Sequence, residues 1–327
     1  GNHTDSLRPF VYDILAHRAI EYFMNGQADA DLVAESFLIN DPLLFSHTDQ
    51  FVTYPNNQSE DTISFGRQII SLFQDLERFH RHDPLPDAWV DVVKKRLKYM
   101  YDHFIGSEKT QLYESALNQW IQVFANTSYA APFELSKAQL FETLGRQYQA
   151  GSQDSIYQQY LVKASALYQG ILSKYKNTDE ASLAKNQLNE LLKPSLDGQV
   201  EKVNLPQKPF RILAGYQNVS KIFIKVIPIS LELRSTILSD YRDNVLQQVL
   251  AVKSIRAFSQ DVPGAEDMQS HKVEIKIDAL PPGMYGLVLC NSESFKIGEN
   301  MLSLMFTHVS QLAYLHSFNQ YYNASKD

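Results

Sequence analysis

The sequence predicts an α+β protein with two domains, an all-helical domain over residues 1–196 and an antiparallel β-sandwich over residues 197–327. Through the first part, apolar residues recur every third or fourth position, as they do on one face of a helix. The composition changes at Lys193-Pro194-Ser195-Leu196-Asp197-Gly198, and beyond it apolar and polar residues begin to alternate, as in strands. At ~150 residues per domain, a chain of 327 residues has room for both.

The first helix is predicted to begin near Ser6 and to stop at Asn25-Gly26, because glycine readily ends a helix. Its apolar positions are Val11, Leu15, Ala19 and Phe23. A short helix is expected over residues 29–39. Apolar spacing then predicts helices over residues 69–79, 89–104 and 112–124, with stops at Asp83-Pro84 and Gly106.

Three more helices are expected between residues 132 and 193. The middle one and its exit carry small and aromatic residues at helical spacing, namely Ala164, Tyr168, Ile171, Tyr175, Ala181 and Ala184. Small residues allow two helices to approach closely, while the tyrosines fill the groove between them. The pattern resembles one tetratricopeptide-type helical hairpin of bacterial envelope proteins, although Lys176 stands where those repeats often have proline.

The second domain is predicted from short runs with a period of two. Strands are expected over residues 211–214, 221–227, 273–277, 285–290 and 306–314, and Pro281-Pro282-Gly283 forms a turn. The stretch from residue 231 to 257 has a more helical pattern, so we expect it to be a helical insertion in the sandwich. Short strands separated by proline and glycine turns are typical of an immunoglobulin-like sandwich.

Several segments together resemble the N-terminal region of large alpha-2-macroglobulin-like proteins of Bacteroidetes. These segments are Leu7–Phe23, Leu205-Pro206 with Gly215–Val226, Ser270–Tyr285 with its Leu280-Pro281-Pro282-Gly283-Met284-Tyr285 turn, and His308–Ala313. The resemblance implies that the sandwich is a first macroglobulin-like domain and that the chain is part of a longer peptidase inhibitor. The Cys-x-Glu-Gln thioester motif of some members is absent, because Cys290 is followed by Asn291-Ser292-Glu293.

This resemblance implies a non-catalytic scaffold that contacts downstream macroglobulin-like domains of its own chain, and possible peptidase targets, in the periplasm or at the outer membrane. The composition adds exclusions. A net charge of −7 argues against a nucleic-acid partner, and a single cysteine excludes an internal disulfide. No apolar run approaches ~18 residues, so no transmembrane segment is expected. We therefore predict no enzyme activity, no cofactor and no metal site.

Four groups of side chains are candidate sites. His80-Arg81-His82-Asp83 has the spacing of a metal ligand pair, but we interpret it as a solvated helix end. Asp13, His17 and Glu21 share one helix face and suit metal binding or acid–base chemistry, although a salt-bridged stripe is the simpler interpretation. The basic run Lys94-Lys95-Arg96-Leu97-Lys98 is interpreted as a solvated face, and Cys290 as a buried, inert thiol.

Two alternative functions remain open. An envelope module that binds glycan or peptide would use aromatic side chains exposed in a groove between helices. The chain has 18 tyrosines and 18 phenylalanines, although most fall on helical periods typical of a core. A hydrolase would use the face formed by Asp13, His17 and Glu21.

Overall fold

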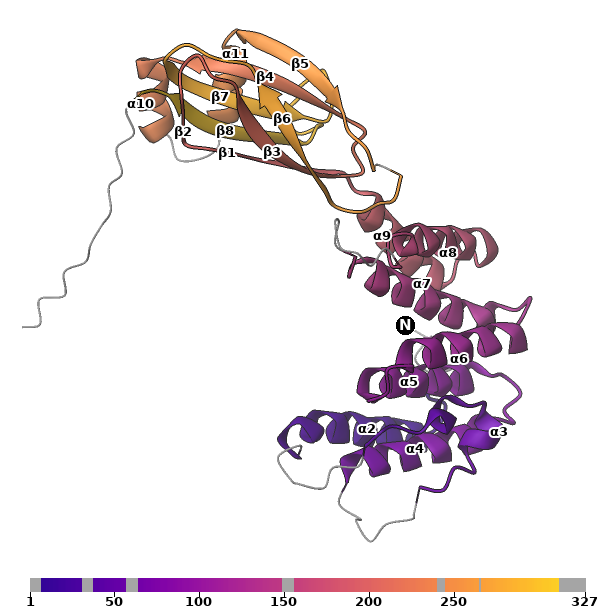
Figure 1. Ribbon diagram of the computed structural model, residues 1–327. Coiled ribbons are helices and arrows are strands. Elements are labelled where there is room, and N and C mark those ends of the chain that lie inside the picture. The colour runs from indigo at the N-terminus through magenta and orange to yellow at the C-terminus, as the bar shows by residue number, and fades with distance from the viewer. Residues whose placement is uncertain are drawn as a thin grey trace, which may run out of the picture. The chain divides into compact units, whose positions relative to one another are not determined.

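The computed structural model describes residues 7–30, 38–56, 64–148, 156–239, 245–264 and 266–311. The chain divides into two compact units, the first made of Gly1–Leu144 and Lys163–Asn189, the second of Gly145–Val162 and Glu190–Asp327. Helices dominate the first unit and β-sheets the second, so the predicted α+β class is confirmed (Figure 1). In the described part of the chain, no helix combines the length and apolar character needed to cross a bilayer.

The N-terminal part contains a series of helices. They are α2 (Val11–Ala30), η1 (Pro42–Phe45), α3 (Thr48–Phe51), α4 (Phe65–His80), α5 (Asp87–His103), α6 (Lys109–Val123), η2 (Ser128–Ala130), α7 (Ala131–Gly145), α8 (Tyr160–Lys174) and α9 (Asp179–Leu192). The helices predicted over residues 69–79, 89–104 and 112–124 are confirmed as α4, α5 and α6. In Figure 1, α2 and α4 lie side by side, with α5 and α6 next in order.

The core of the helical unit is built from the predicted apolar faces. Ile69 and Phe73 of α4, with Leu97 and Met100 of α5, are fully buried. The largest fully buried side chain is Trp120 of α6. Burying side chains of this size contributes ~1.5–3 kcal/mol each, which is why the apolar spacing determines which helix faces meet.

Trp120 lies at the centre of an aromatic cluster that joins several helices. Its ring stacks on His47 with a centroid distance of 4.6 Å and on Phe133 of α7 at 5.7 Å. Trp89 of α5 meets it edge to face at 5.2 Å. Both tryptophans of the chain therefore lie in the helical unit.

The predicted stop at Asn25-Gly26 is wrong, because α2 continues to Ala30. Gly26 serves close packing instead, since a Cβ at this position would lie 3.0 Å from Cε2 of Phe65. The rings of Phe23 and Phe65 are 5.4 Å apart at the same contact. Of the short helix expected over residues 29–39, residues 31–37 lie outside the described residues, and residues 38–40 are not helical.

The segment with the tetratricopeptide-type pattern forms the helical pair α8 and α9. Ala164 and Ala184 are fully buried, as close helix packing requires. The tyrosines connect α8 to α7, because the Tyr168 hydroxyl donates to Glu142 Oε2 at 2.7 Å and the Tyr175 hydroxyl to Glu134 Oε1 at 2.9 Å. Tyrosine thus supplies both packing and a hydrogen bond at this interface.

The second unit contains two packed sheets. The strands are β1 (Ser195–Val200), β2 (Val203–Asn204), β3 (Phe210–Gln217), β4 (Lys221–Ile229), β5 (Arg256–Asp261), β6 (His271–Ile277), β7 (Gly283–Cys290) and β8 (Leu302–Val309). One sheet has the order β1-β3-β6 and the other β2-β8-β7-β4-β5. The described strand pairs are antiparallel, as predicted, except for the short pair β2 and β8, which is parallel.

The parallel pair follows from the path of the chain. After β1, the chain crosses from the three-stranded sheet to the other sheet, where β2 runs alongside β8 with Val203 opposite His308. The predicted turn Pro281-Pro282-Gly283 lies at a later crossing between the sheets, from β6 to β7. The Tyr285 hydroxyl donates to the Pro281 carbonyl at 2.9 Å and fixes this crossing.

Two helices lie where the sequence indicated a helical insertion, α10 (Leu231–Ser239) and α11 (Val245–Ala251). Val249 of α11 is fully buried in a cluster with Ile227, Val288 and Cys290, on the face of the five-stranded sheet that points away from the other sheet. Gly286 allows this approach, because a Cβ there would lie 3.2 Å from Cγ1 of Val249. The insertion therefore covers the outer face of that sheet.

The boundary between the units differs from the predicted position after residue 196. Residues from Glu190 onward group with the second unit, where the Asn218 side chain donates to the carbonyls of Leu191 and Lys193 at 2.8 and 3.2 Å. Residues 145–162 also group with this unit. There the buried Gln269 side chain donates to the Gly145 carbonyl at 3.1 Å.

Candidate functional site

A buried ion pair between α4 and α5 anchors the helical unit. Arg96 and Glu77 are both fully buried, and Arg96 Nε donates to Glu77 Oε1 at 2.5 Å. The guanidinium also donates to the carbonyls of Leu44 and Ser46, at 2.7 and 3.1 Å. The interpretation of the basic run as a solvated helix face is therefore wrong for Arg96, while Lys98 is exposed as expected.

His80 links α2 to the end of α4. Its side chain is 1% exposed, with Nε2 2.7 Å from Asp13 Oδ1 and Nδ1 2.6 Å from Asp83 Oδ2. The imidazole ring therefore bridges a carboxylate of α2 and one just after α4. The interpretation of a solvated helix end is thus wrong for His80, because the fold brings Asp13 onto it, and it fits the exposed His82.

The three candidate residues Asp13, His17 and Glu21 of α2 do not converge on one site. Asp13 is bound to His80, His17 is buried, and Glu21 is exposed. Burial, together with the positive charges of Lys95 and Arg8, lowers the pKa of His17 to about 4. In the described residues, no group of three or more histidine, cysteine or acidic side chains is arranged to hold a metal ion.

Two of these residues, His17 and Glu21, line the helical groove, a cavity of about 620 Å³ that residues of α4, α5, α6, α7 and α9 also line. Tyr101 and Tyr113 stack in its wall with a centroid distance of 4.7 Å. Leu135 and Leu140 of α7 contribute apolar surface, and Lys98 of α5 also lines it. The groove thus combines aromatic and apolar walls with several charged side chains, as ligand-binding clefts do.

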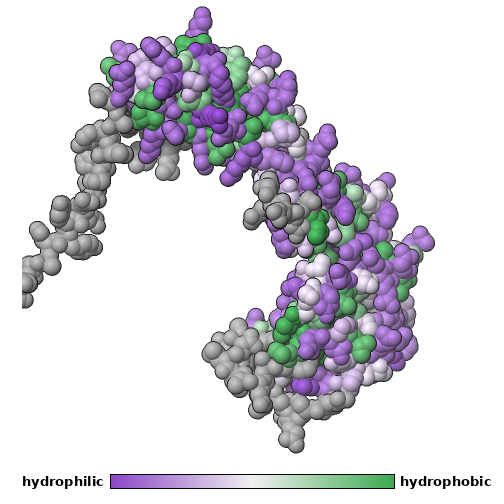
Figure 2. Space-filling view, in the orientation of Figure 1, coloured by the Kyte–Doolittle hydropathy of each residue, from purple (hydrophilic) through white to green (hydrophobic). Residues whose placement is uncertain are grey.

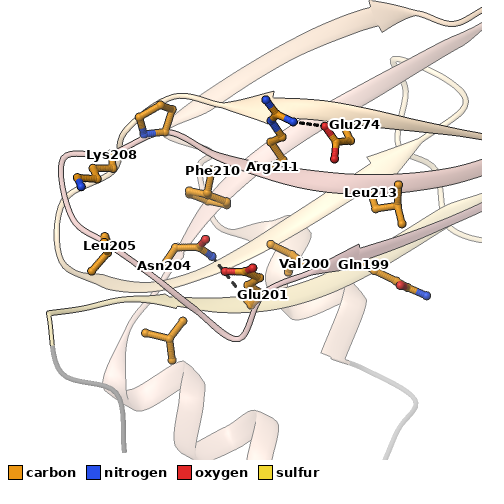
Figure 3. A pocket seen from close by; sticks show the side chains of 12 residues that line it. Gln199, Val200, Glu201, Asn204, Leu205, Lys208, Phe210, Arg211, Leu213 and Glu274 are labelled. Carbon is orange, nitrogen blue, oxygen red and sulfur yellow. Dashed lines mark hydrogen bonds and ion pairs between the residues drawn. The ribbon is translucent and has the colours of Figure 1, made fainter.

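A second cavity, the sandwich pocket, lies where β1 crosses between the sheets (Figure 3). Most of the residues from 199 to 213, together with Glu274 of β6, line its volume of about 650 Å³. Phe210 lies on one side of it and Asn204 on the opposite side, as Figure 3 shows. Both residues are only 8% exposed. Arg211 forms an ion pair with Glu274 nearby.

Cys290 lies at the end of β7 and is fully buried. Burial raises the pKa of its thiol, so the thiolate that acts as a nucleophile is disfavoured. The predicted buried thiol is confirmed.

The sequence reasoning did not identify the sandwich pocket or the buried role of Arg96. A signal for the pocket exists in Val203-Asn204-Leu205-Pro206, where a polar residue interrupts an apolar run ahead of a proline. For Arg96, the signal is its place three residues after Val93 and one before Leu97, both of which are fully buried. An arginine on an apolar helix face requires a buried acidic partner.

Comparisons with known proteins give little resemblance. No protein-family description matches the chain, and no curated protein matches it. Among solved structures, the chain is similar to the CARDB domain of the PF1109 protein from Pyrococcus furiosus, determined in complex with di-metal ions. The match covers 36% of this chain and 92% of that chain, with 8% identity and a TM-score of 0.22. This likeness carries no argument about function.

Proposed function

We propose that the chain is a non-catalytic scaffold region of a macroglobulin-like peptidase inhibitor of the bacterial envelope. The main support for the proposal is that a helical unit precedes a sandwich along the chain. The geometry of the Leu280–Tyr285 segment adds to this support. This segment is one of those that together resemble the family, and it crosses between the sheets with the Tyr285 hydroxyl bound to the Pro281 carbonyl. A segment that determines how two sheets are joined is a structural feature rather than a reactive one.

The use of the charged side chains supports this role. Arg96 and Glu77 join α5 to α4, and His80 joins α4 to α2 through Asp13. Groups engaged in this way hold helices in place and are shielded from a substrate. The proposal assigns recognition of peptidases, and any bait segment, to downstream macroglobulin-like domains of the same chain.

A scaffold also needs surfaces for its neighbours, and α2 offers one. Val11, Leu15 and Tyr22 follow one side of the helix and are 72%, 60% and 69% exposed. Hydrophobic patches also appear between hydrophilic residues on the face of the helical unit seen in Figure 2. Clustered apolar side chains of this kind mark contact surfaces between proteins.

The mass of the native polypeptide in its source cells tests the proposal. An antibody raised against this chain, used in a blot of fractionated cells, should detect an envelope protein far larger than 37.4 kDa. Antibody first saturated with the purified chain serves as the control for specificity. A specific band near 37.4 kDa would refute the scaffold proposal, because no downstream domain would then exist.

A binding module is the second candidate, and the helical groove favours it. Tyr101 is partly exposed there, with its ring stacked on Tyr113. An aromatic face of this kind suits a sugar ring or an apolar peptide side chain. Titration calorimetry with peptidoglycan fragments and with peptides would test it. Tyr101→Ala should abolish binding, whereas Tyr22→Ala on α2, away from the groove, should not; equal effects of both would reject the groove as the site.

A further inference from the structure

We propose that the sandwich pocket binds an extended peptide segment, which takes the place that β1 vacates beside β3. This inference goes beyond the proposed scaffold role, because it assigns a binding site to the sandwich itself. It rests on the strand pairing around the pocket, on a buried amide and on the charges at its rim.

The strand β1 pairs with β3 only from Ile212 onward and leaves the first two residues of β3 without a partner on this side among the described strands. Val200 is opposite Ile212 in the last pair, and the chain then leaves for the other sheet. On its other side β3 stays paired with β6 to the end, with Arg211 opposite Lys276 and Phe210 opposite Ile277. The first two residues of β3 therefore face the pocket where a neighbouring strand would lie. An extended peptide adds to such an edge through its main chain.

Asn204 supplies a polar group matched to a peptide backbone. Its Nδ2 donates to the Thr307 hydroxyl at 2.9 Å and to the Glu201 carbonyl at 3.2 Å, which uses both of its N–H groups. These bonds fix the orientation of the amide. Among the described residues, Oδ1 has no donor, and Figure 3 shows this oxygen on the Phe210 side. A backbone N–H is the donor that an extended segment would present to it.

The other side chains that line the pocket include both apolar and charged groups. Leu205 is 54% exposed and Phe210 offers its ring, so an apolar side chain has a place between them. Lys208 is exposed at the left of Figure 3 and has no ion-pair partner in the described chain. Glu201 lies beside Asn204. A peptide with alternating apolar and acidic residues therefore fits, with its acidic side chain toward Lys208.

A saccharide fits the pocket less well. Sugar recognition needs several polar side chains around one ring, whereas Arg211 and Glu274 are already paired with each other. Asn204 is the single buried amide among the lining residues. The strand edge, by contrast, offers main-chain groups at the spacing of another strand.

The test uses the full chain labelled with nitrogen-15 and two capped probe pentapeptides. One probe is acetyl-Thr-Val-Glu-Val-Thr-amide, and the other carries lysine in place of glutamate. Titration followed by nuclear magnetic resonance should shift the side-chain amide signal of Asn204 and the backbone signals of residues 199–213, more strongly with the glutamate peptide. Replacing the central glutamate with proline, which removes a backbone N–H, should weaken binding.

A charge reversal separates the pocket from general electrostatics. Lys208→Glu should weaken binding of the glutamate peptide up to ~5-fold and strengthen binding of the lysine peptide, as expected for an exposed pair. Lys272→Glu is the matched control, an exposed lysine of β6 outside the pocket lining, and it should change neither affinity. Leu205→Ala should weaken both peptides through loss of apolar contact.

Three outcomes would overturn the proposal. The first is that the signals of the pocket residues do not shift with either peptide at millimolar concentration. The second is that Lys208→Glu and Lys272→Glu change the peptide affinities equally. The third is that chitotriose or maltotriose shifts the Asn204 signal while the peptides do not, which would make the pocket a glycan site. None of these results depends on the mass of the native polypeptide, so this inference and the scaffold proposal can fail separately.

Discussion

Replacing Arg96 by methionine tests whether the buried ion pair anchors the helical unit. The change keeps much of the side-chain volume but leaves the Glu77 carboxylate in the core with only the Thr48 hydroxyl, which donates to it at 2.6 Å. An uncompensated buried charge costs ~3–5 kcal/mol. The carbonyls of Leu44 and Ser46 lose their donors at the same time. Because whole domains are stable by only ~5–15 kcal/mol, we expect Arg96→Met to come close to unfolding the helical unit.

Urea unfolding followed by tryptophan fluorescence measures this effect in the helical unit alone. The chain has two tryptophans, Trp89 and Trp120, and both lie there. Lys98→Met on the same helix is the matched control, because it removes the exposed pair with Asp102 and should cost ~0.5 kcal/mol or less. Equal urea midpoints for Arg96→Met and Lys98→Met would refute the reasoning.

The double variant Arg96→Met with Glu77→Leu completes the cycle. Removal of both charges eliminates the uncompensated carboxylate, so the double variant should be more stable than Arg96→Met alone. If the double variant is as unstable as the sum of the two single variants, the ion pair does not couple α4 to α5.

Two further predictions concern protonation and backbone conformation. Because the pKa of His17 is about 4 in the folded chain and ~6.5 when unfolded, the unfolded chain binds the proton more readily, and stability should fall by up to about 3 kcal/mol as the pH drops from 7 to 4. His17→Gln should flatten this dependence in urea titrations at each pH, and an unchanged slope would contradict it. Gly264→Ala should lower the melting temperature more than Gly298→Ala. Both glycines have positive φ, but only at Gly264 would a Cβ collide with the His271 ring. Equal decreases in melting temperature, measured by calorimetry, would show that backbone strain at positive φ, and not the contact with His271, determines the loss of stability.

The elements that could be predicted from the sequence are those in which the alternation of apolar and polar side chains matches their burial in the structure. The helices α4 to α6 have regular apolar faces, and β6 alternates from Lys272 to Ile277 as a strand with one exposed face does. The strand β1 was not predicted, because Gly198 has no side chain to show a period of two. The reason for this glycine lies in the other sheet, since a Cβ there would lie 2.6 Å from the sulfur of Met305.

The candidate site was harder to predict than the fold, because its contacts join residues distant in sequence. His80 and Asp13 are 67 positions apart, and Arg96 is 52 positions from the Leu44 carbonyl that it binds. Residue type and local spacing therefore suggested solvated groups at positions that tertiary packing buries. Cys290 was predicted correctly, because the apolar strand around it already determines its burial.

The strand order of the sandwich has a consequence for synthesis on the ribosome. The strand β8 is among the last parts of the described chain to be made, and it lies inside its sheet between β2 and β7. The hydrogen bond from Asn204 to Thr307 can form only after a further 103 residues have been made. Neighbouring helices of the first unit, by contrast, can pack against each other as they emerge. Contacts this distant make folding slow. The nascent sandwich therefore presents an unpaired, apolar β7 edge for a time, and it is this unit, rather than the helices, that we expect chaperones to protect.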